Sequence, residues 1–473
     1  MKSLSGVDGA FLHLETAQTP MHVGSLHLFE LPDGVTPTDF LAEVRRQMRR
    51  RLRLAPVLTR KLAPMPLQFA NPVWVEDDAI DWRYHVQHLS LEAPGTQAQL
   101  EALAGRLHSE LLDRRRPLWR MAVIDGLASD QVAYYFQIHH AVLDGQAGVL
   151  LSQALFDTTP APRPLPRGKA AQAEHPGTLA LAAAALRHDA AQYVKLLRHL
   201  PDVARTLAGL IGPSPGGKAP PKGGGLGQNF SVGPKTALNV PISGERGFAT
   251  VSLPLVALKA LAEAHEAKLN DIVLALCGGA LRRWLAAHGG VPDRPLIATM
   301  PISLREGGNT DFSVQATLSL VNLNTHIADP VQRLRAIRDA AGAVKTLARR
   351  ARGVIPTDFP SLGTPWLLQA LAALYERSTA IEAMPPIANL VISNVPGPPV
   401  PLYAAGARMT AYWPLSIVEH GIGLNVTVMS YAGDMGFGFT TARCAVPDAR
   451  ELSIALVAAF DELLARSPHA TPR

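Results

Sequence analysis

Two adjacent histidines, His139 and His140, stand in the segment QIHHAVLDGQAG, and a carboxylate, Asp144, follows shortly after them. Gly145 comes next and would let the chain turn tightly out of the loop. The segment follows a run that predicts a strand and precedes a run that predicts a helix. Because neighbouring side chains on a strand point to opposite faces, the two histidines are expected to meet different surroundings.

This spacing favours acid–base chemistry over the other uses of histidine. One metal ion cannot easily take ligands from both faces of a strand, and the sequence has no further ligand cluster, so no metal is expected. A nucleophilic triad needs a serine or cysteine in a suitable context, and none stands out. A histidine that removes a proton from a bound hydroxyl or thiol remains, since its ordinary pKa lies near neutrality. The other histidine of the pair would then be a hydrogen-bonded residue of the core.

The elements that must position this motif alternate between strands and helices. Residues 121–127 and 131–140 predict two strands joined by a turn, and residues 148–157 predict the helix after the motif. The later part of the chain alternates in the same way. Its predicted strands are 248–255, 294–304, 316–324, 389–399 and a hairpin at 423–442, and its predicted helices lie within 255–289, 330–351 and 448–467.

Composition divides the 473 residues into three parts. Residues 1–157 form an N-terminal domain that carries the histidine motif. Residues 158–246 are expected to form a connector with amphipathic helices and a mobile loop rich in proline and glycine. Residues 247–473 form a C-terminal α/β domain. This length by itself fits two or three domains.

The charge balance and the cysteine content limit the classes of partner. The formal charge of +6 fits an anionic partner such as a phosphorylated coenzyme or an acidic membrane surface. No basic module with interleaved aromatic residues is visible, so nucleic acid is not expected. Two cysteines, no secretion signal and no spanning stretch predict a cytoplasmic protein whose membrane contact is peripheral.

The H-H-x-x-x-D-G spacing resembles the signature of the CoA-dependent acyltransferase superfamily. Other segments resemble the bacterial wax ester synthase/diacylglycerol acyltransferase family, in order and over nearly the whole chain. These segments are PMHVG at 20–24, RPLWR at 116–120, LND at 269–271 and NVPGP at 394–398.

The resemblance implies an α/β fold of two chloramphenicol-acetyltransferase-like domains with mixed sheets and an active-site tunnel at their interface. It implies a long-chain O-acyltransferase that moves a fatty acyl group from acyl-CoA to a fatty alcohol, to diacylglycerol or to both. Acyl-CoA is then a substrate, and no cofactor is implied. Such substrates are poorly soluble, so loading from the inner face of the membrane or from lipid droplets is expected.

The resemblance also assigns roles to residues. His140 would remove the hydroxyl proton and return it to the CoA thiolate, with no covalent intermediate, while His139 and Asp144 would be structural. Asn270 would be a polar partner in the site, and Asp271 would be structural at a helix start. The remaining candidates are Pro117, Leu118 and Trp119 as packing residues, Asn394, Pro396 and Gly397 as a rigid turn beside the channel, and Arg305 as a contact to the CoA phosphates.

Two other functions stay open at the level of sequence. One is a condensation-type acyltransferase that uses another alcohol or an amine; a neighbouring carrier-protein domain would favour it, and none is present. The other is a lipid-droplet protein that binds lipid with an inactive site. The intact His140, Asp144 and Asn270 argue against the second.

Overall fold

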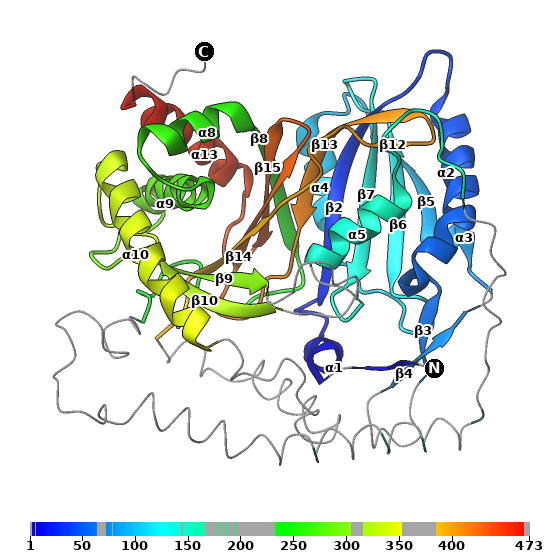
Figure 1. Ribbon diagram of the computed structural model, residues 1–473, viewed down its shortest axis with the longest axis horizontal. Coiled ribbons are helices and arrows are strands. Elements are labelled where there is room, and N and C mark those ends of the chain that lie inside the picture. The colour runs from blue at the N-terminus through cyan, green and yellow to red at the C-terminus, as the bar shows by residue number, and fades with distance from the viewer. Residues whose placement is uncertain are drawn as a thin grey trace.

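We describe a computed structural model of the chain (Figure 1). The structure describes residues 2–4, 6–63, 72–77, 79–142, 145–165, 177, 183, 187, 194, 232–303, 316–351 and 385–467.

The first of two six-stranded sheets carries the histidine motif. Its strand order is β12-β13-β2-β7-β6-β5, antiparallel except for the parallel pair β5–β6. The strands are β2 (His22–Glu30), β5 (Val86–Ser90), β6 (Trp119–Asp125), β7 (Val132–His139), β12 (Tyr403–Ala404) and β13 (Ala407–Leu415). Every residue of β7 is buried, as expected for a central strand rich in β-branched and aromatic residues.

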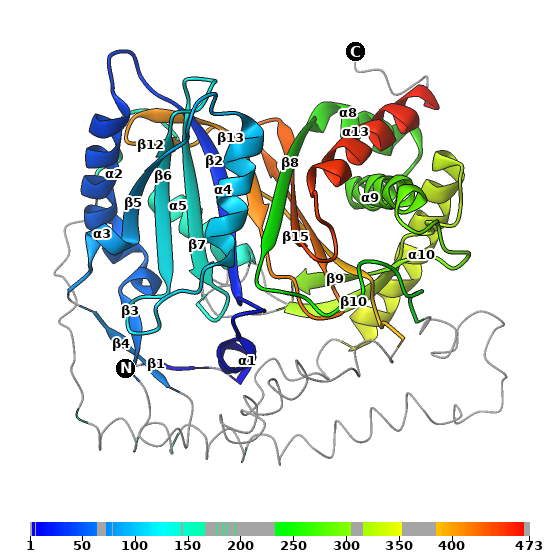
Figure 2. The same ribbon diagram turned by 180° about the vertical axis from the view of Figure 1, so that it is seen from behind.

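Helices cover both faces of this sheet. Figure 1 shows α5 (Gly145–Leu155) in front of β2, β7 and β6, and Figure 2 shows α4 (Gln97–Ser109) on the opposite face. Near the edge formed by β5 lie α2 (Pro37–Arg51) and α3 (Trp82–His85). The buried Arg51 at the end of α2 forms an ion pair with Asp157, which ties α2 to the chain just after α5.

The second six-stranded sheet has the order β10-β9-β11-β14-β15-β8 and includes the parallel pairs β9–β11 and β11–β14. Its strands are β8 (Arg246–Pro254), β9 (Ile297–Ser303), β10 (Ala316–Asn322), β11 (Leu390–Val395), β14 (Leu424–Tyr431) and β15 (Asp434–Ala442). The helices α8 (Leu255–Ala264), α9 (Leu269–Ala287), α10 (Pro330–Ala351) and α13 (Arg450–Ala465) lie on the side away from the first sheet (Figure 1). Between these helices and the sheet lies the largest apolar core.

Smaller elements close the lower end of the first sheet in Figure 1. A three-stranded sheet, β1-β4-β3, is formed by β1 (Lys2–Ser3), β3 (Arg60–Ala63) and β4 (Val73–Glu76). Two single-turn helices, η1 (Leu52–Leu54) and η2 (Pro56–Leu58), precede β3. The helix α1 (Gly6–Leu14) lies beside the start of β2.

The mixed α/β class is present, and so are the strands and helices predicted before and after the connector, including the hairpin β14–β15. The amphipathic helices and the loop predicted for the connector lie almost entirely outside the described residues. One pairing was not foreseen: β12 and β13 come from the C-terminal third of the chain, yet β13 pairs with β2 of the first sheet. Strand pairing between distant segments leaves no local pattern in the sequence. The boundaries at residues 157 and 246 stay a prediction. Within the described part of the chain, no helix has the length and apolarity needed to cross a membrane.

The two sheets meet where β13 crosses β15, and two glycines make the crossing possible. A Cβ atom on Gly436 would lie 2.3 Å from the Tyr412 carbonyl oxygen, and one on Gly438 would lie 1.9 Å from the Pro414 carbonyl oxygen. The G-F-G pattern of β15 therefore puts backbone of the second sheet against backbone of the first.

This crossing predicts a large effect of a small substitution. Gly438→Ala should lower the free energy of unfolding by about 2 kcal/mol or more, because the new methyl group meets backbone that cannot yield easily. Urea-induced unfolding followed by fluorescence measures the change. Asp434→Ala, at an exposed position of the same strand, is the control. Equal midpoints for wild type and Gly438→Ala would contradict the role given to this crossing.

Candidate active site

His140 lies immediately after β7, at the end of the strand near α1. Its backbone N–H donates to the Met21 carbonyl oxygen at 2.8 Å, and its ring stacks on Phe11 of α1 with centroids 4.2 Å apart. The His140 side chain lines a cavity of about 470 Å³. The catalytic candidate thus has a fixed backbone and a ring held at the wall of a large internal space.

The cavity lies between the two sheets. The first sheet contributes side chains from β2, β7 and β13, and α5 closes the same side. The second sheet contributes residues of β9, β11 and β14. Most of the lining residues are apolar, such as Phe136, Ile138 and Leu151, so the space suits a hydrocarbon chain.

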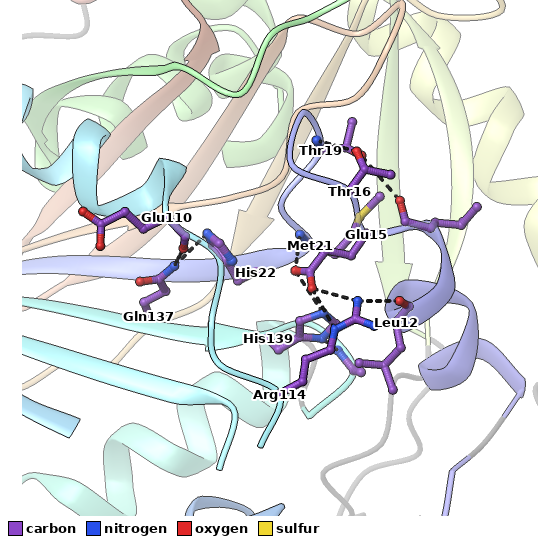
Figure 3. Close-up of polar contacts among 12 residues, drawn as sticks. Leu12, Glu15, Thr16, Thr19, Met21, His22, Glu110, Arg114, Gln137 and His139 are labelled. Atoms are coloured by element: carbon purple, nitrogen blue, oxygen red, sulfur yellow. Dashed lines mark hydrogen bonds and ion pairs between the residues drawn. The ribbon is translucent and has the colours of Figure 1, made fainter. Parts of the chain in front are cut away.

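His139 points away from this cavity and is completely buried. Its Nδ1 accepts the Ala141 backbone N–H at 3.0 Å, and its Nε2 lies 3.3 Å from Oε1 of Glu15 (Figure 3). Because Nδ1 accepts a hydrogen bond, the ring proton belongs on Nε2, where it faces the Glu15 carboxylate. The two histidines therefore leave the chain on opposite faces, and each has a different environment.

Glu15 binds three partners at once (Figure 3). Its carboxylate accepts hydrogen bonds from Arg114 at 2.8 Å and from the Met21 backbone at 3.1 Å, in addition to facing His139. Burial alone would raise the pKa of Glu15, but its interactions with His139 and with the charged Arg114 outweigh burial. They lower the pKa from the ordinary value of 4.5 to about 2. Glu15 is consequently ionised at any working pH.

The segment Pro117–Trp119 supports the same strand end. The Leu118 carbonyl oxygen accepts the His139 backbone N–H at 2.9 Å. Leu118 and Trp119 are fully buried, and the Trp119 indole donates to the Leu58 carbonyl oxygen at 2.8 Å. These residues contact the backbone that carries the histidines.

Asn270 and Asn394 meet on the helix side of the second sheet. Nδ2 of Asn394 donates to Oδ1 of Asn270 at 3.3 Å, and Nδ2 of Asn270 faces the Met300 sulfur at 3.7 Å. Strand alternation explains this placement, because Ser393 and Thr299 line the cavity while their neighbours in the chain point toward α9. In this arrangement the Asn270 amide supports the end of β11.

Asp271 lies one residue further along α9 and is buried. Its carboxylate accepts the Lys268 backbone N–H at 2.9 Å, in the first turn of the helix. A carboxylate there satisfies an unpaired donor and complements the helix dipole.

The turn after β11 lies against β14. The Gly397 N–H donates to Oγ of Ser430 at 3.1 Å, and a Cβ atom on Gly397 would lie 2.1 Å from the Ser430 carbonyl oxygen. The turn that begins at Pro396 therefore requires glycine at its closest approach. Val395 before the turn and Met429 beneath it both line the cavity.

Two candidates, Asp144 and Arg305, lie outside the described residues. Gly145 is the first residue of α5. Among the residues that the structure describes, no group of three histidine, cysteine or acidic side chains could hold a metal ion.

The chain matches two family descriptions that together cover most of its length. Residues 4–273 match the wax ester synthase/diacylglycerol acyltransferase catalytic domain, and residues 315–464 match the C-terminal domain of the same family. The chain belongs to the wax ester synthase/diacylglycerol acyltransferase family. The resemblance inferred from the sequence motifs is confirmed, and the protein is an O-acyltransferase.

Curated relatives cover this acyltransferase almost from end to end. A protein of Mycobacterium tuberculosis H37Rv, whose name assigns it provisionally to the diacylglycerol O-acyltransferases, is 35% identical over 97% of this chain and 99% of its own. An O-acyltransferase of Acinetobacter baylyi is 32% identical over 96% of this chain and 94% of its own.

Solved structures show the same architecture. The wax ester synthase/diacylglycerol acyltransferase of Marinobacter aquaeolei matches with a TM-score of 0.70 and 28% identity, over 99% of this chain and 100% of that one. The first condensation domain of the calcium-dependent antibiotic synthetase matches with a TM-score of 0.56 over 100% and 97%, at 15% identity, which indicates a shared fold.

Sequence reasoning did not find Glu15 or Arg114. Both lie far from the histidine motif in the sequence, and neither has a spacing that points to it. The closeness of Glu15 to the PMHVG segment was the one available hint, since Met21 contacts both Glu15 and His140. The Met21 N–H donates to Glu15, and the Met21 carbonyl oxygen accepts the His140 N–H.

The contact between Glu15 and His139 predicts a loss of activity on substitution. Glu15→Gln removes the charge that holds the His139 proton on Nε2, so the Ala141 hydrogen bond and the His140 backbone become less ordered. We expect the turnover rate to fall roughly ten- to hundredfold, the value of a hydrogen bond to a charged group. Glu110→Gln, which breaks a half-exposed ion pair with Arg120, is the control. Full activity in Glu15→Gln would contradict this role.

Proposed function

We propose that this acyltransferase transfers a long fatty acyl chain from acyl-CoA to a long-chain alcohol or to diacylglycerol, with His140 as the general base. The observation that carries the proposal is the placement of the His140 ring at the wall of a large, mostly apolar cavity. A base at the wall of a water-poor space can act on a hydroxyl group that the surrounding side chains hold in place.

The proposed reaction is a single displacement at the thioester. His140 takes the proton of the acceptor hydroxyl while the oxygen forms a bond to the thioester carbonyl carbon. The carbon–sulfur bond of the tetrahedral intermediate then breaks, and protonated His140 gives its proton to the departing CoA thiolate. Atoms and charge balance without a covalent bond between enzyme and substrate.

The contacts around His139 support this assignment. The His139 ring accepts the backbone N–H of Ala141. The His139 backbone N–H donates to the Leu118 carbonyl oxygen, and the His139 carbonyl oxygen accepts the Val142 N–H. The residues on both sides of His140 are therefore held in place. Such support is what a base needs, because misplacement by about 1 Å costs a large factor in rate. In this proposal His139, Leu118 and Glu15 position the base, and Asn270 with Asn394 supports the opposite wall.

The cavity and the relatives together support long-chain acceptors. Apolar residues of β2, β7 and α5 form most of one side of the cavity. Among the related proteins, the Mycobacterium tuberculosis and Marinobacter aquaeolei proteins carry names that refer to diacylglycerol or wax ester acyltransferases. We also propose that the enzyme takes up these poorly soluble substrates while bound peripherally to the inner membrane face or to a lipid droplet.

Release of CoA from palmitoyl-CoA tests the function. Hexadecanol and diacylglycerol are supplied separately, and thiol formation is followed with a thiol reagent. We expect release that depends on an acceptor, and His140→Ala should abolish it while the folded structure is retained.

The histidine control is His88→Ala, because His88 is partly exposed and pairs with Asp125, on the strand edge away from the cavity. It should retain full activity. If His140→Ala released CoA at the wild-type rate in the presence of an acceptor, the proposed mechanism would be wrong. If folded wild-type protein released no CoA with either acceptor, the proposed substrates would be wrong.

A further inference from the structure

The cavity contains a carboxylate that the proposed reaction does not use. Glu419 lines the cavity, and among the described lining residues it is the sole acidic one. No hydrogen bond or ion pair joins its carboxylate to any other residue that the structure describes. The Glu419 side chain is accessible from the cavity, so its carboxylate can meet a hydrogen-bond donor that enters there.

The backbone around Glu419 is held in place, so the side chain cannot easily leave the cavity. Residues Glu419–Ile422 form a tight turn, in which the Glu419 N–H donates to the Ile422 carbonyl oxygen at 3.2 Å. Asn239 donates to the Gly421 carbonyl oxygen at 2.8 Å, and His420 accepts the Ile242 N–H at 3.0 Å. The turn is therefore fixed from outside the cavity while Glu419 faces inward.

The turn lies at the same end of the first sheet as His140. Leu415, the last residue of β13, pairs with Gly24 of β2, and Gly24 pairs with Gln137 of β7. Beyond these paired residues, the chain after β13 leads to Glu419 and the chain after β7 leads to His140, in the same direction along the sheet. Glu419 and His140 thus approach the same end of the cavity from strands that are two positions apart in the sheet.

The wall beside Glu419 is more polar than the wall formed by the first sheet. Four hydroxyl- or amide-bearing residues of the second sheet line the cavity there: Thr299, Ser393, Asn425 and Thr427. Ser393 and Thr427 are paired across β11 and β14. Asn425 also donates to the Ile417 carbonyl oxygen at 2.8 Å, which steadies the segment that leads to Glu419.

We propose that Glu419 is a specificity-determining residue that binds a second hydrogen-bond donor on the acceptor, next to the hydroxyl group that reacts at His140. The inference rests on the proposed function. The ligand class is a long-chain alcohol with an adjacent hydroxyl or amino group, since an ionised carboxylate accepts hydrogen bonds and donates none. A simple fatty alcohol fills the apolar part of the cavity and leaves Glu419 unpaired.

The test compares three acceptors of equal chain length with palmitoyl-CoA as donor: hexadecan-1-ol, hexadecane-1,2-diol and 2-aminohexadecan-1-ol. The specificity constant kcat/KM is measured for wild type, Glu419→Leu and Glu419→Gln. We expect wild type to prefer at least one substituted acceptor to hexadecan-1-ol, and Glu419→Leu to lower that preference roughly tenfold. Hexadecan-1-ol itself should react with Glu419→Leu at least as fast as with wild type.

Glu419→Gln separates the two kinds of acceptor. Its amide oxygen still accepts a hydrogen bond from a hydroxyl group, so preference for the diol should survive in part. Its lost charge should remove preference for the ammonium group of the amino alcohol. Asp461→Asn, at an exposed position on α13, is the control and should match wild type with all three acceptors.

Equal acceptor ratios in wild type and Glu419→Leu would overturn the inference. Equilibrium binding of the same three acceptors is measured in parallel, so the role of Glu419 is scored even if no acyl transfer occurs. Failure of wild type to release CoA with any acceptor would count against the proposed function. A binding preference that Glu419→Leu abolishes would still support the site.

Discussion

The site depends on one buried contact, the 3.3 Å approach of His139 Nε2 to the Glu15 carboxylate. The contact assigns the ring proton to Nε2 and leaves Nδ1 free to accept the Ala141 N–H. It thereby orders the backbone that carries His140. Arg114 stabilises this arrangement, because its charge and hydrogen bond offset the free-energy cost of burying the Glu15 carboxylate. None of His139, Glu15 and Arg114 lines the cavity, so their effect on it passes through the backbone.

The cavity exists because the two sheets touch where β13 meets β15 and are farther apart elsewhere. At the crossing of β13 and β15 the backbones touch, and only glycine fits on β15. Elsewhere the facing surfaces of β2, β7, β9, β11 and β14 diverge around about 470 Å³ of space. Strand β13 is central to both features, because it belongs to the first sheet by hydrogen bonding and to the second half by sequence. A change at this crossing would therefore alter the shape of the cavity as well as the stability.

The two walls of the cavity differ in chemistry, and this difference bears on the choice of acceptor. The first sheet and α5 offer mainly apolar side chains, which suit the methylene groups of a long chain. The second sheet offers hydroxyl and amide groups, and Glu419 stands beside them. His140 lines the same cavity. An acceptor with a polar head and a long tail fits this division better than a uniform hydrocarbon does.

Much of this protein was determined by local sequence. The strand, turn and helix around His139 and His140, the hairpin β14–β15 and the helical pair α8–α9 each follow from periodicity and turn residues within a short window. The spacing of the histidines, together with the segments RPLWR, LND and NVPGP, was enough to predict the family and the α/β class. Alternation along a strand was also enough to expect that the two rings meet different surroundings.

Local sequence could not decide which distant residues contact the two histidine rings. The pairing of β13 with β2, the approach of Glu15 to His139, the turning of Asn270 toward Asn394 and the entry of Glu419 into the cavity all join segments that are far apart in the chain. Such contacts are selected by how whole elements pack, and packing is a property of the assembled sheets rather than of any single stretch of residues.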